Sequence, residues 1–182
     1  MKQSLVALSL GLLTLTAGTS AFASTGTNLK FEGRITADGC PIEIVNPGDN
    51  SSVSVVSLGD VPASKFENVG EEYVGKRFDL VIRDGAKCGF ADNSATVTFT
   101  GTADPSGDYF AVTGGSDGAK GVAISLRDKD SKVIKPGTAT DAYDLNNTGE
   151  TRLPFNAYYR SIAPTVTAGT ASAIVTFTVD II

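Results

Sequence analysis

The amino-acid sequence predicts an all-β fold in which short strands form a sandwich. Apolar and polar residues alternate with a period of two along most of the chain, which is the pattern of half-buried strands. Clusters of Gly, Pro, Asn and Asp separate these segments, and the 182 residues include 20 Gly. No segment sustains a helical period over roughly eleven residues, and the best helical candidate is a short one around residues 62–67.

The chain begins with a segment typical of an export signal. Lys2 precedes an apolar run at residues 5–15, and small residues stand at Ala21 and Ala23. This arrangement is the one that signal peptidase recognises. The run is too short to cross a hydrocarbon core of about 30 Å comfortably, so a membrane anchor is the less favoured alternative. We expect cleavage between Ala23 and Ser24, which removes residues 1–23 as a signal peptide.

The composition argues against several classes of function. The absence of His excludes Ser-His-Asp catalysis and His-ligated metal sites. The net charge of −5 argues against a nucleic-acid partner, which needs a basic surface. Acidic pairs at Asp104/Asp108 and Asp128/Asp130 fit hairpin turns better than a calcium site. We expect no enzyme activity, no cofactor and no metal.

The only two cysteines predict one disulfide. Cys40 and Cys88 have no Cys-x-x-Cys neighbour, and export brings the chain to a compartment where disulfides form. A Cys40–Cys88 bridge is therefore favoured over a reactive thiol. It would close a loop large enough to stabilise the fold by roughly 4 kcal/mol.

The strands follow from the alternation, in chain order. The first strand is at residues 29–35. The second has on one face Phe78, Leu80 and Ile82, and the third has Val97 and Phe99. The fourth has Val122, Ile124 and Leu126 on one face. A fifth has Leu153, Phe155, Ala157 and Tyr159, and the last has Ala173, Val175, Phe177, Val179 and Ile181. Many short strands and one disulfide predict a single immunoglobulin-like sandwich over residues 36–182.

Two segments do not fit an ordinary sandwich. Residues 24–35 form an amphipathic arm with Leu29, Phe31, Gly33 and Ile35 on one side and Lys30, Glu32 and Arg34 on the other. The last predicted strand ends with the chain at Ile182, so no further strand covers its apolar side. The strand beginning near Cys40 is expected to form the other wall of the groove left open. The arm supplies the missing type of strand, either to its own groove or to another molecule, and the pattern leaves both possibilities open.

The whole chain resembles a pilus subunit (fimbrillin) of the bacterial chaperone–usher family, type 1 fimbrillin-like. The resemblance rests on several blocks in order: LKFEGRI, ADGC with its Cys seven residues after Gly33, KC at residues 87–88, AKGVAISLRD, LPFNAYY, VTAGTA and VTFTV. Members of this family usually carry an aromatic residue close to the C-terminus, where this chain ends Asp180-Ile181-Ile182.

The resemblance implies an incomplete immunoglobulin-like sandwich that lacks its last strand and is completed by donor-strand exchange. Residues 24–35 would be the donor strand, with Leu29, Phe31, Gly33 and Ile35 facing the groove. The acceptor groove and chaperone contact would be formed by Ala173, Val175, Phe177, Val179 and Ile181. The implied partners are a periplasmic chaperone, an outer-membrane usher, other pilus subunits and host surface receptors.

The resemblance also implies a function: a structural subunit of a fimbrium on the cell surface that supports cell adhesion. The alternative is a minor or tip subunit that binds carbohydrate, for which Tyr109-Phe110 and Tyr158-Tyr159 are the candidate stacking residues. Alternation places one residue of each pair in the core, which argues against that alternative. A secreted enzyme is the third hypothesis, and no set of acid, base and nucleophile supports it.

Overall fold

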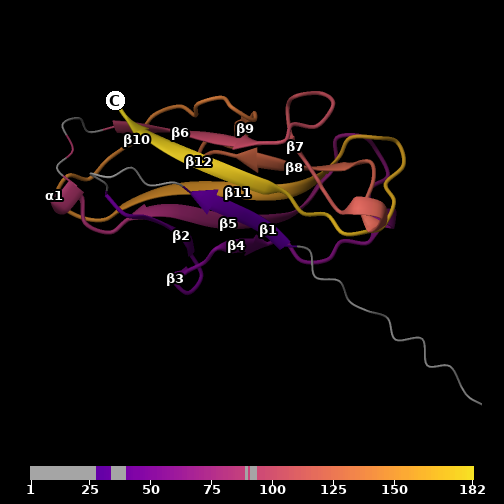
Figure 1. The fold of residues 1–182 in the computed structure, drawn as a ribbon, viewed down its shortest axis with the longest axis horizontal. Helices are drawn as coiled ribbons and strands as arrows, with labels where there is room; N and C mark the ends of the chain where they lie inside the picture. Colours follow the sequence, from indigo (N-terminus) through magenta and orange to yellow (C-terminus); the bar gives the residue numbers. More distant parts are fainter. Residues whose placement is uncertain (1–27, 34–39, 89, 91–93) are drawn as a thin grey trace, which may run out of the picture.

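Two β-sheets packed face to face make up the fold in the computed structural model, which describes residues 28–33, 40–88, 90 and 94–182 (Figure 1). The five-stranded sheet has the order β10-β6-β12-β1-β4. Its strands are β1 (Asn28–Gly33), β4 (Val55–Ser57), β6 (Ser94–Gly101), β10 (Tyr143–Asp144) and β12 (Ile174–Ile181). The prediction of an immunoglobulin-like sandwich is confirmed.

The seven-stranded sheet has the order β3-β2-β5-β11-β8-β7, and β9 pairs with β8. Its strands are β2 (Ile42–Asn46), β3 (Ser51–Ser52), β5 (Glu72–Ile82), β7 (Phe110–Ala111), β8 (Val122–Arg127), β9 (Val133–Ile134) and β11 (Thr151–Ser161). The longest ladder joins β5 and β11, where Phe155 lies opposite Phe78 and Leu153 opposite Leu80. Directly paired residues share a face of the sheet, so these apolar pairs point together toward the five-stranded sheet.

Four phenylalanines fill the centre of the core between the sheets. Phe99 of β6 is fully buried, and its ring centroid lies 5.0 Å from that of Phe155, 6.4 Å from that of Phe78 and 6.3 Å from that of Phe177. The positions that alternation assigned to the inside of β5, β6, β8 and β11 are all buried. In the two aromatic pairs, Phe110 and Tyr159 are the buried members, as predicted.

The last strand departs from its prediction at its end. Ala173, Val175 and Phe177 are buried, but Val179 is only half-buried and Ile181 is 39% exposed. Ile181 lies opposite Ala95 at the beginning of β6. Val179 and Ile181 lie beyond Phe177, the last residue of β12 that pairs with the described part of β1.

In the described part of the chain, helical structure is confined to single turns. A 3₁₀ turn at Ala63–Lys65 lies within the predicted segment, and a second one spans Gly115–Asp117. The sequence did not predict α1 (Gly85–Cys88), where Asp84 Oδ1 accepts a hydrogen bond from the Lys87 backbone N–H. This is the contact of an N-cap, so Asp84 was the signal that could have found the turn. Within the described ranges, no helix has the length and hydropathy needed to cross a membrane.

The predicted disulfide between Cys40 and Cys88 is present, with its two Cα atoms 4.8 Å apart. It joins the segment just before β2 to α1, which follows β5. Both cysteines pack against a small cluster of Ile82, Ala95 and Leu145 at one end of the sandwich. The disulfide thus fixes the beginning of β2 at that end.

The aromatic cluster makes a prediction about stability. Phe99→Ala should lower the free energy of unfolding by about 3–5 kcal/mol, because it leaves a cavity among three other rings. Urea unfolding followed by circular dichroism measures the loss. Val69→Ala is the control, since Val69 is 58% exposed and its truncation should change the stability by at most about 0.5 kcal/mol. A loss below about 1 kcal/mol for Phe99→Ala would contradict this account of the core.

The disulfide makes a second prediction. Replacing both cysteines with serine should cost about 4 kcal/mol of stability, because the bridge closes a loop between residues 48 positions apart. Thermal and urea unfolding of the double variant and the oxidised wild type give the difference. Equal unfolding midpoints in the two proteins would show that the bridge does not constrain the unfolded chain.

Candidate functional site

The N-terminal strand β1 lies in the interior of the five-stranded sheet, between β12 and β4. It pairs in parallel with β12, with Phe31 opposite Val175, and antiparallel with β4, with Leu29 opposite Val56. In this order β12 and β4 do not pair with each other, so they form the two walls of a groove that β1 fills. Without β1, both walls would present a row of unpaired backbone N–H and C=O groups.

The register of β1 places the arm residues that the sequence singled out opposite core residues of the groove. Positions 29, 31 and 33 lie opposite Val56, Val175 and Phe177, which are at most 7% exposed. Positions 30 and 32 lie opposite Ile174 and Thr176, which are exposed. The alternation of the arm therefore matches that of its walls. Ile35 and the cleavage site at Ala23 and Ser24 lie outside the described residues.

The second wall is not the strand that the sequence indicated. The strand beginning near Cys40 is β2, which belongs to the seven-stranded sheet, and the neighbour of β1 is β4. The chain turns back after β2 in a hairpin to β3 and then crosses to the other sheet before Val55. Val56 and Leu58 are both buried, and their alternation is the signal that could have identified β4.

The direction of β1 follows from its covalent connection to Cys40. Val179, near the end of β12, packs against the same small cluster as Cys40 and Cys88, so β12 ends at the disulfide end of the sandwich. Only six residues separate Gly33 from Cys40, so the Cα atoms of these two residues lie at most about 25 Å apart. The arm must therefore finish near that end, so within its own groove it runs parallel to β12. Figure 1 shows both arrows pointing to the end that carries α1.

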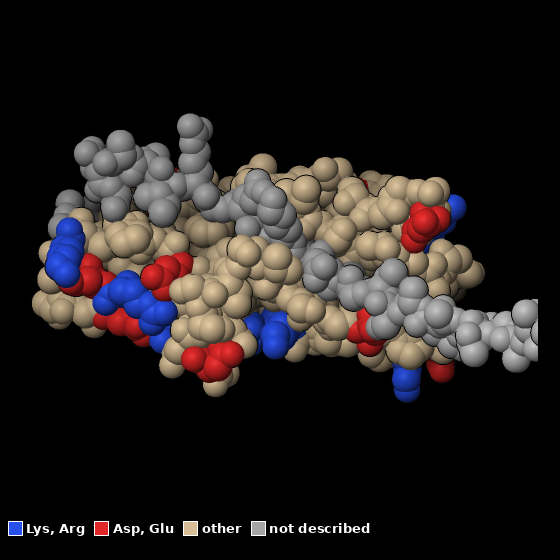
Figure 2. Space-filling model, turned by 60° about the horizontal axis from the view of Figure 1, so that its bottom comes forward, with Lys and Arg blue, Asp and Glu red and all other residues tan. Residues whose placement is uncertain are grey.

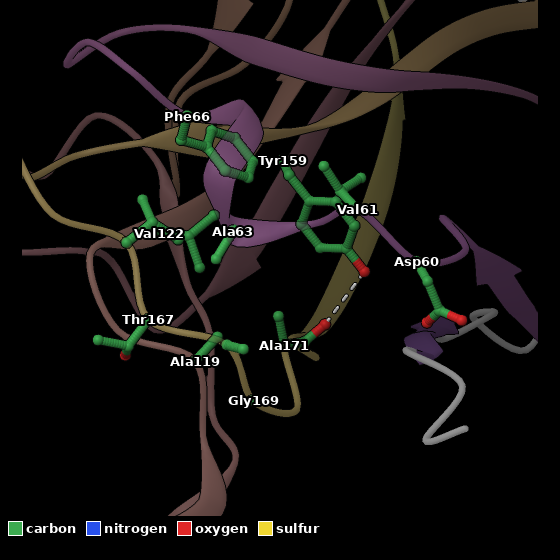
Figure 3. Close-up of a pocket in the computed structure, with 12 residues that line it drawn as sticks. Asp60, Val61, Ala63, Phe66, Ala119, Val122, Tyr159, Thr167, Gly169 and Ala171 are labelled. Atoms are coloured by element: carbon green, nitrogen blue, oxygen red, sulfur yellow. Dashed lines mark hydrogen bonds between the residues drawn. The ribbon is translucent and has the colours of Figure 1, made fainter. Parts of the chain in front are cut away.

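A partly open cavity of about 190 Å³ lies at the opposite end of the groove (Figure 3). Asp60 and Val61 line it just after β4, and Ala171 lines it just before β12. Phe66 and Tyr159 add aromatic surface, and the Tyr159 hydroxyl donates a hydrogen bond of 3.5 Å to the Ala171 carbonyl. The sequence analysis did not predict this cavity, because it forms between residues far apart in the chain.

The groove and cavity offer strand pairing and apolar burial. Among the described residues, Asp60 is the only carboxylate that lines the cavity. Burial raises the pKa of Tyr143 in β10, at the far edge of the sheet from β1. Hydrogen bonds from Ser52 and Arg83 lower the pKa of Glu43 in the other sheet. Across the described ranges, no cluster of three or more His, Cys, Asp or Glu side chains could hold a metal ion.

Known proteins resemble this chain over nearly its full length. The family described as fimbrial protein matches residues 29–181. A probable major fimbrial subunit, LpfA of Escherichia coli O157:H7, is 33% identical over 175 residues, which are 94% of this chain and 93% of that protein. A type-1 fimbrial protein subunit of Serratia marcescens is 30% identical, over 99% of both chains.

Solved structures agree with the sequence matches. An antigen and type I fimbria protein of Burkholderia pseudomallei superimposes with a TM-score of 0.53 at 26% identity, covering 85% of this chain and 92% of that one. A chaperone–usher pilus subunit superimposes with a TM-score of 0.55 at 19% identity, covering 94% of this chain and 100% of that one, and shares the fold. The chain belongs to the fimbrial protein family.

Proposed function

We propose that this chain is a structural subunit that polymerises without covalent bonds by inserting residues 24–35 into the groove of the neighbouring subunit. The observation that carries the proposal is the position of β1 between β12 and β4. An N-terminal segment that fills an interior position of a sheet can be replaced by the same segment of another copy. Strand addition of this kind is the established mode of chaperone–pilin recognition.

Burial supplies the driving force for filling the groove. Val56, Val175 and Phe177 are core residues that would lose cover on one side if the arm left. Each fully buried apolar side chain contributes roughly 1.5–3 kcal/mol, and ladder bonds fix the register. An empty groove therefore costs free energy, because it exposes apolar side chains and unpaired backbone groups. A periplasmic chaperone would fill the groove with one of its own strands. The neighbour's arm would replace that strand at an outer-membrane usher.

Strand direction favours the neighbour's arm over the subunit's own arm. A neighbour's arm is not connected to this subunit's Cys40, so it can run antiparallel to β12, which is the slightly more stable pairing. Its C-terminal half would then lie where β12 begins, at the cavity lined by Val61 and Phe66. Ile35, the last apolar residue of the alternating set, could enter that cavity. In its own groove the described part of the arm runs the other way, parallel to β12.

The resulting contact builds a filament. The arm and the groove are different surfaces, so the contact is head-to-tail and does not close on itself. Repetition adds one subunit at a time and places the protein in a fimbrium on the cell surface, where it supports adhesion. Host receptors would then be contacted by the assembled fibre.

Substitution in the arm tests the exchange. Gly33→Lys should abolish filaments, because position 33 has the parity of the arm's apolar residues and the neighbour's groove would have to accept a buried ammonium group. The variant subunit should still be recovered with its chaperone, since its own groove is unchanged. Electron microscopy of cells and of purified assembly mixtures measures the outcome. Glu32→Lys is the control, because position 32 has the opposite parity. Normal filaments from the Gly33→Lys variant would contradict the assignment of residues 24–35 as the donor strand.

Cross-linking tests the self-inserted state. Lys30 lies opposite Ile174, and neighbouring strands place such Cα atoms about 4.8 Å apart, within the range of a disulfide. Lys30→Cys/Ile174→Cys monomers should form an intramolecular bridge on mild oxidation, which locks the arm and prevents polymerisation. Non-reducing electrophoresis and peptide mass spectrometry measure the bridge. Lys30→Cys/Thr178→Cys is the control, because position 178 lies four residues further along β12. Bridges found only between subunits would contradict self-insertion.

A further inference from the structure

A second cavity, which we call the outer cavity, lies on the outer side of the seven-stranded sheet. Its volume is about 230 Å³, and it is partly open to solvent. The connection before β5, the loop before β7 and the end of β11 form its walls. Tyr159 of β11 is buried between the sheets, so the next residue, Arg160, points outward into this region. Among the described residues, none lines both the outer cavity and the cavity beside the groove.

The guanidinium group of Arg160 forms a polar wall of the outer cavity. Elsewhere on this sheet arginines pair with carboxylates, as Arg83 does with Glu43 at 3.0 Å. Figure 2 shows such contacts between acidic and basic side chains on the side that carries β2 and β3. Arg160 pairs with Glu72 at 3.1 Å and also lies over the ring of Tyr109, 4.7 Å from the ring centroid. A guanidinium has five N–H donors, which is more than this ion pair uses.

Hydrogen bonds within the chain hold the walls of the outer cavity in place. The buried Asp104 carboxylate accepts hydrogen bonds from the Tyr109 backbone N–H at 3.0 Å and from the Ser106 hydroxyl at 2.8 Å. On the other wall, the buried Ser161 hydroxyl donates a hydrogen bond of 2.6 Å to the Asn68 carbonyl. The cavity is therefore formed before a ligand arrives, which lowers the entropic cost of binding.

The shape and polarity of the outer cavity fit a sugar ring. Its apolar surface comes from the Tyr109 ring, Val69, Pro105 and Ile162. A pyranose has a face of C–H groups, which packs against apolar and aromatic surface, and hydroxyl groups at its rim, which hydrogen-bond to polar side chains. The volume lies below the range of sites for drug-sized ligands, so it suits a single ring.

The charge of the outer cavity argues against an ionised ligand. Among the described residues, Asp104 and Arg160 are the only charged ones that line it, and their charges cancel. An anion would lie close to the Asp104 carboxylate, and a cation would lie close to the Arg160 guanidinium. The net charge of −5 on the whole chain further disfavours an anion.

We infer that the outer cavity binds an uncharged hexopyranose, with the C–H face of the sugar against Tyr109 and its hydroxyl groups bonded to Arg160. The sequence singled out Tyr109-Phe110 as a candidate stacking pair, and the structure buries Phe110 and leaves Tyr109 at this cavity. The inference goes beyond the proposed function and does not rest on it, because the groove belongs to the other sheet. A fibre would repeat the site in every subunit and so raise the avidity of a weak contact.

Titration of the isolated subunit with sugars tests the site. The probes are the methyl pyranosides of glucose, galactose, mannose and N-acetylglucosamine, and the backbone amide NMR signals of the protein report binding. At least one probe should bind with a dissociation constant of about 1 mM, because a single ring makes few contacts. The signals that shift should belong to residues 104–109 and 160–162, which surround the cavity. The absence of saturable shifts with all four probes, or shifts centred elsewhere, would overturn the inference.

Tyr109→Ala should weaken the binding at least about fivefold, because it removes the aromatic surface. Tyr158→Ala is the matched control and should leave the dissociation constant unchanged. Tyr158 lies on the same sheet with Arg127 over its ring, 6.0 Å from the centroid, but it does not line the outer cavity. Equal losses in the two variants would overturn the role of Tyr109.

Arg160→Met provides a second variant in case Tyr109→Ala does not fold. Glu72 would keep its ion pair with Arg127 at 2.9 Å, so no carboxylate would be left without a partner. Loss of the guanidinium donors should weaken binding at least about fivefold. Unchanged binding would show that Arg160 does not contact the sugar.

A charged probe tests the class of ligand. Methyl glucuronoside differs from methyl glucoside in bearing a carboxylate, and it should bind no more tightly than the glucoside. Tighter binding of the glucuronoside would assign the outer cavity to an anion instead.

The two proposals can fail separately. Tyr109→Ala subunits should still form filaments of normal appearance in electron microscopy, since the arm and the groove are unchanged. If arm exchange proved wrong, the isolated subunit should still bind the sugar. Loss of filaments from folded Tyr109→Ala subunits would overturn the independence of the outer cavity from assembly.

Discussion

The pairing of β1 with both β12 and β4 is the interaction on which the rest of the structure depends. An interior position of a sheet must be filled, because an empty one leaves two rows of backbone groups without partners and uncovers the core. The sheet neighbour of β4 is β1, and β4 has only three residues. The integrity of one sheet therefore depends on a segment joined to the domain by six residues. Under the proposed function, the same dependence makes the segment exchangeable, because any strand with the right alternation can fill the position.

Much of this architecture could be predicted from the sequence, because apolar residues at every second position identify the buried face of a strand. The inward residues of β5, β8 and β11 alternate without interruption, and the two cysteines had no other partner. The arm was recognisable for the same reason, with Phe31 and Gly33 sharing one parity. Single-strand patterns do not specify which strands become neighbours, however. The sequence indicated β2 as the second wall, but β4 occupies that place. The difference depends on where the chain crosses between the sheets after the short hairpin of β2 and β3.

The cavity shows a second limit of sequence reasoning. Val61 and Phe66 come from the connection between β4 and β5, Tyr159 comes from β11 and Ala171 precedes β12, and no sequence motif links these three segments. Their apolar character was visible, but their convergence at the beginning of β12 is a property of the packed sandwich. The direction of β1 could not be predicted either, because an alternating pattern is the same in both directions. The direction follows from the position of Cys40 at one end of the fold. The exposure of Ile181 is likewise not apparent from alternation, since this residue lies beyond Phe177, where the described pairing of β12 with β1 ends.

The short connection between β1 and Cys40 also sets the conditions under which subunits can assemble. A covalently attached arm competes for its groove at an effective concentration in the millimolar range, far above that of free neighbours in dilute solution. Simple mass action therefore keeps isolated subunits closed. Under the proposed function, assembly then depends less on how many subunits are present than on an event that opens a groove beside a neighbour's arm. A connection of only six residues between β1 and Cys40 would therefore confine growth to the place where the groove is opened.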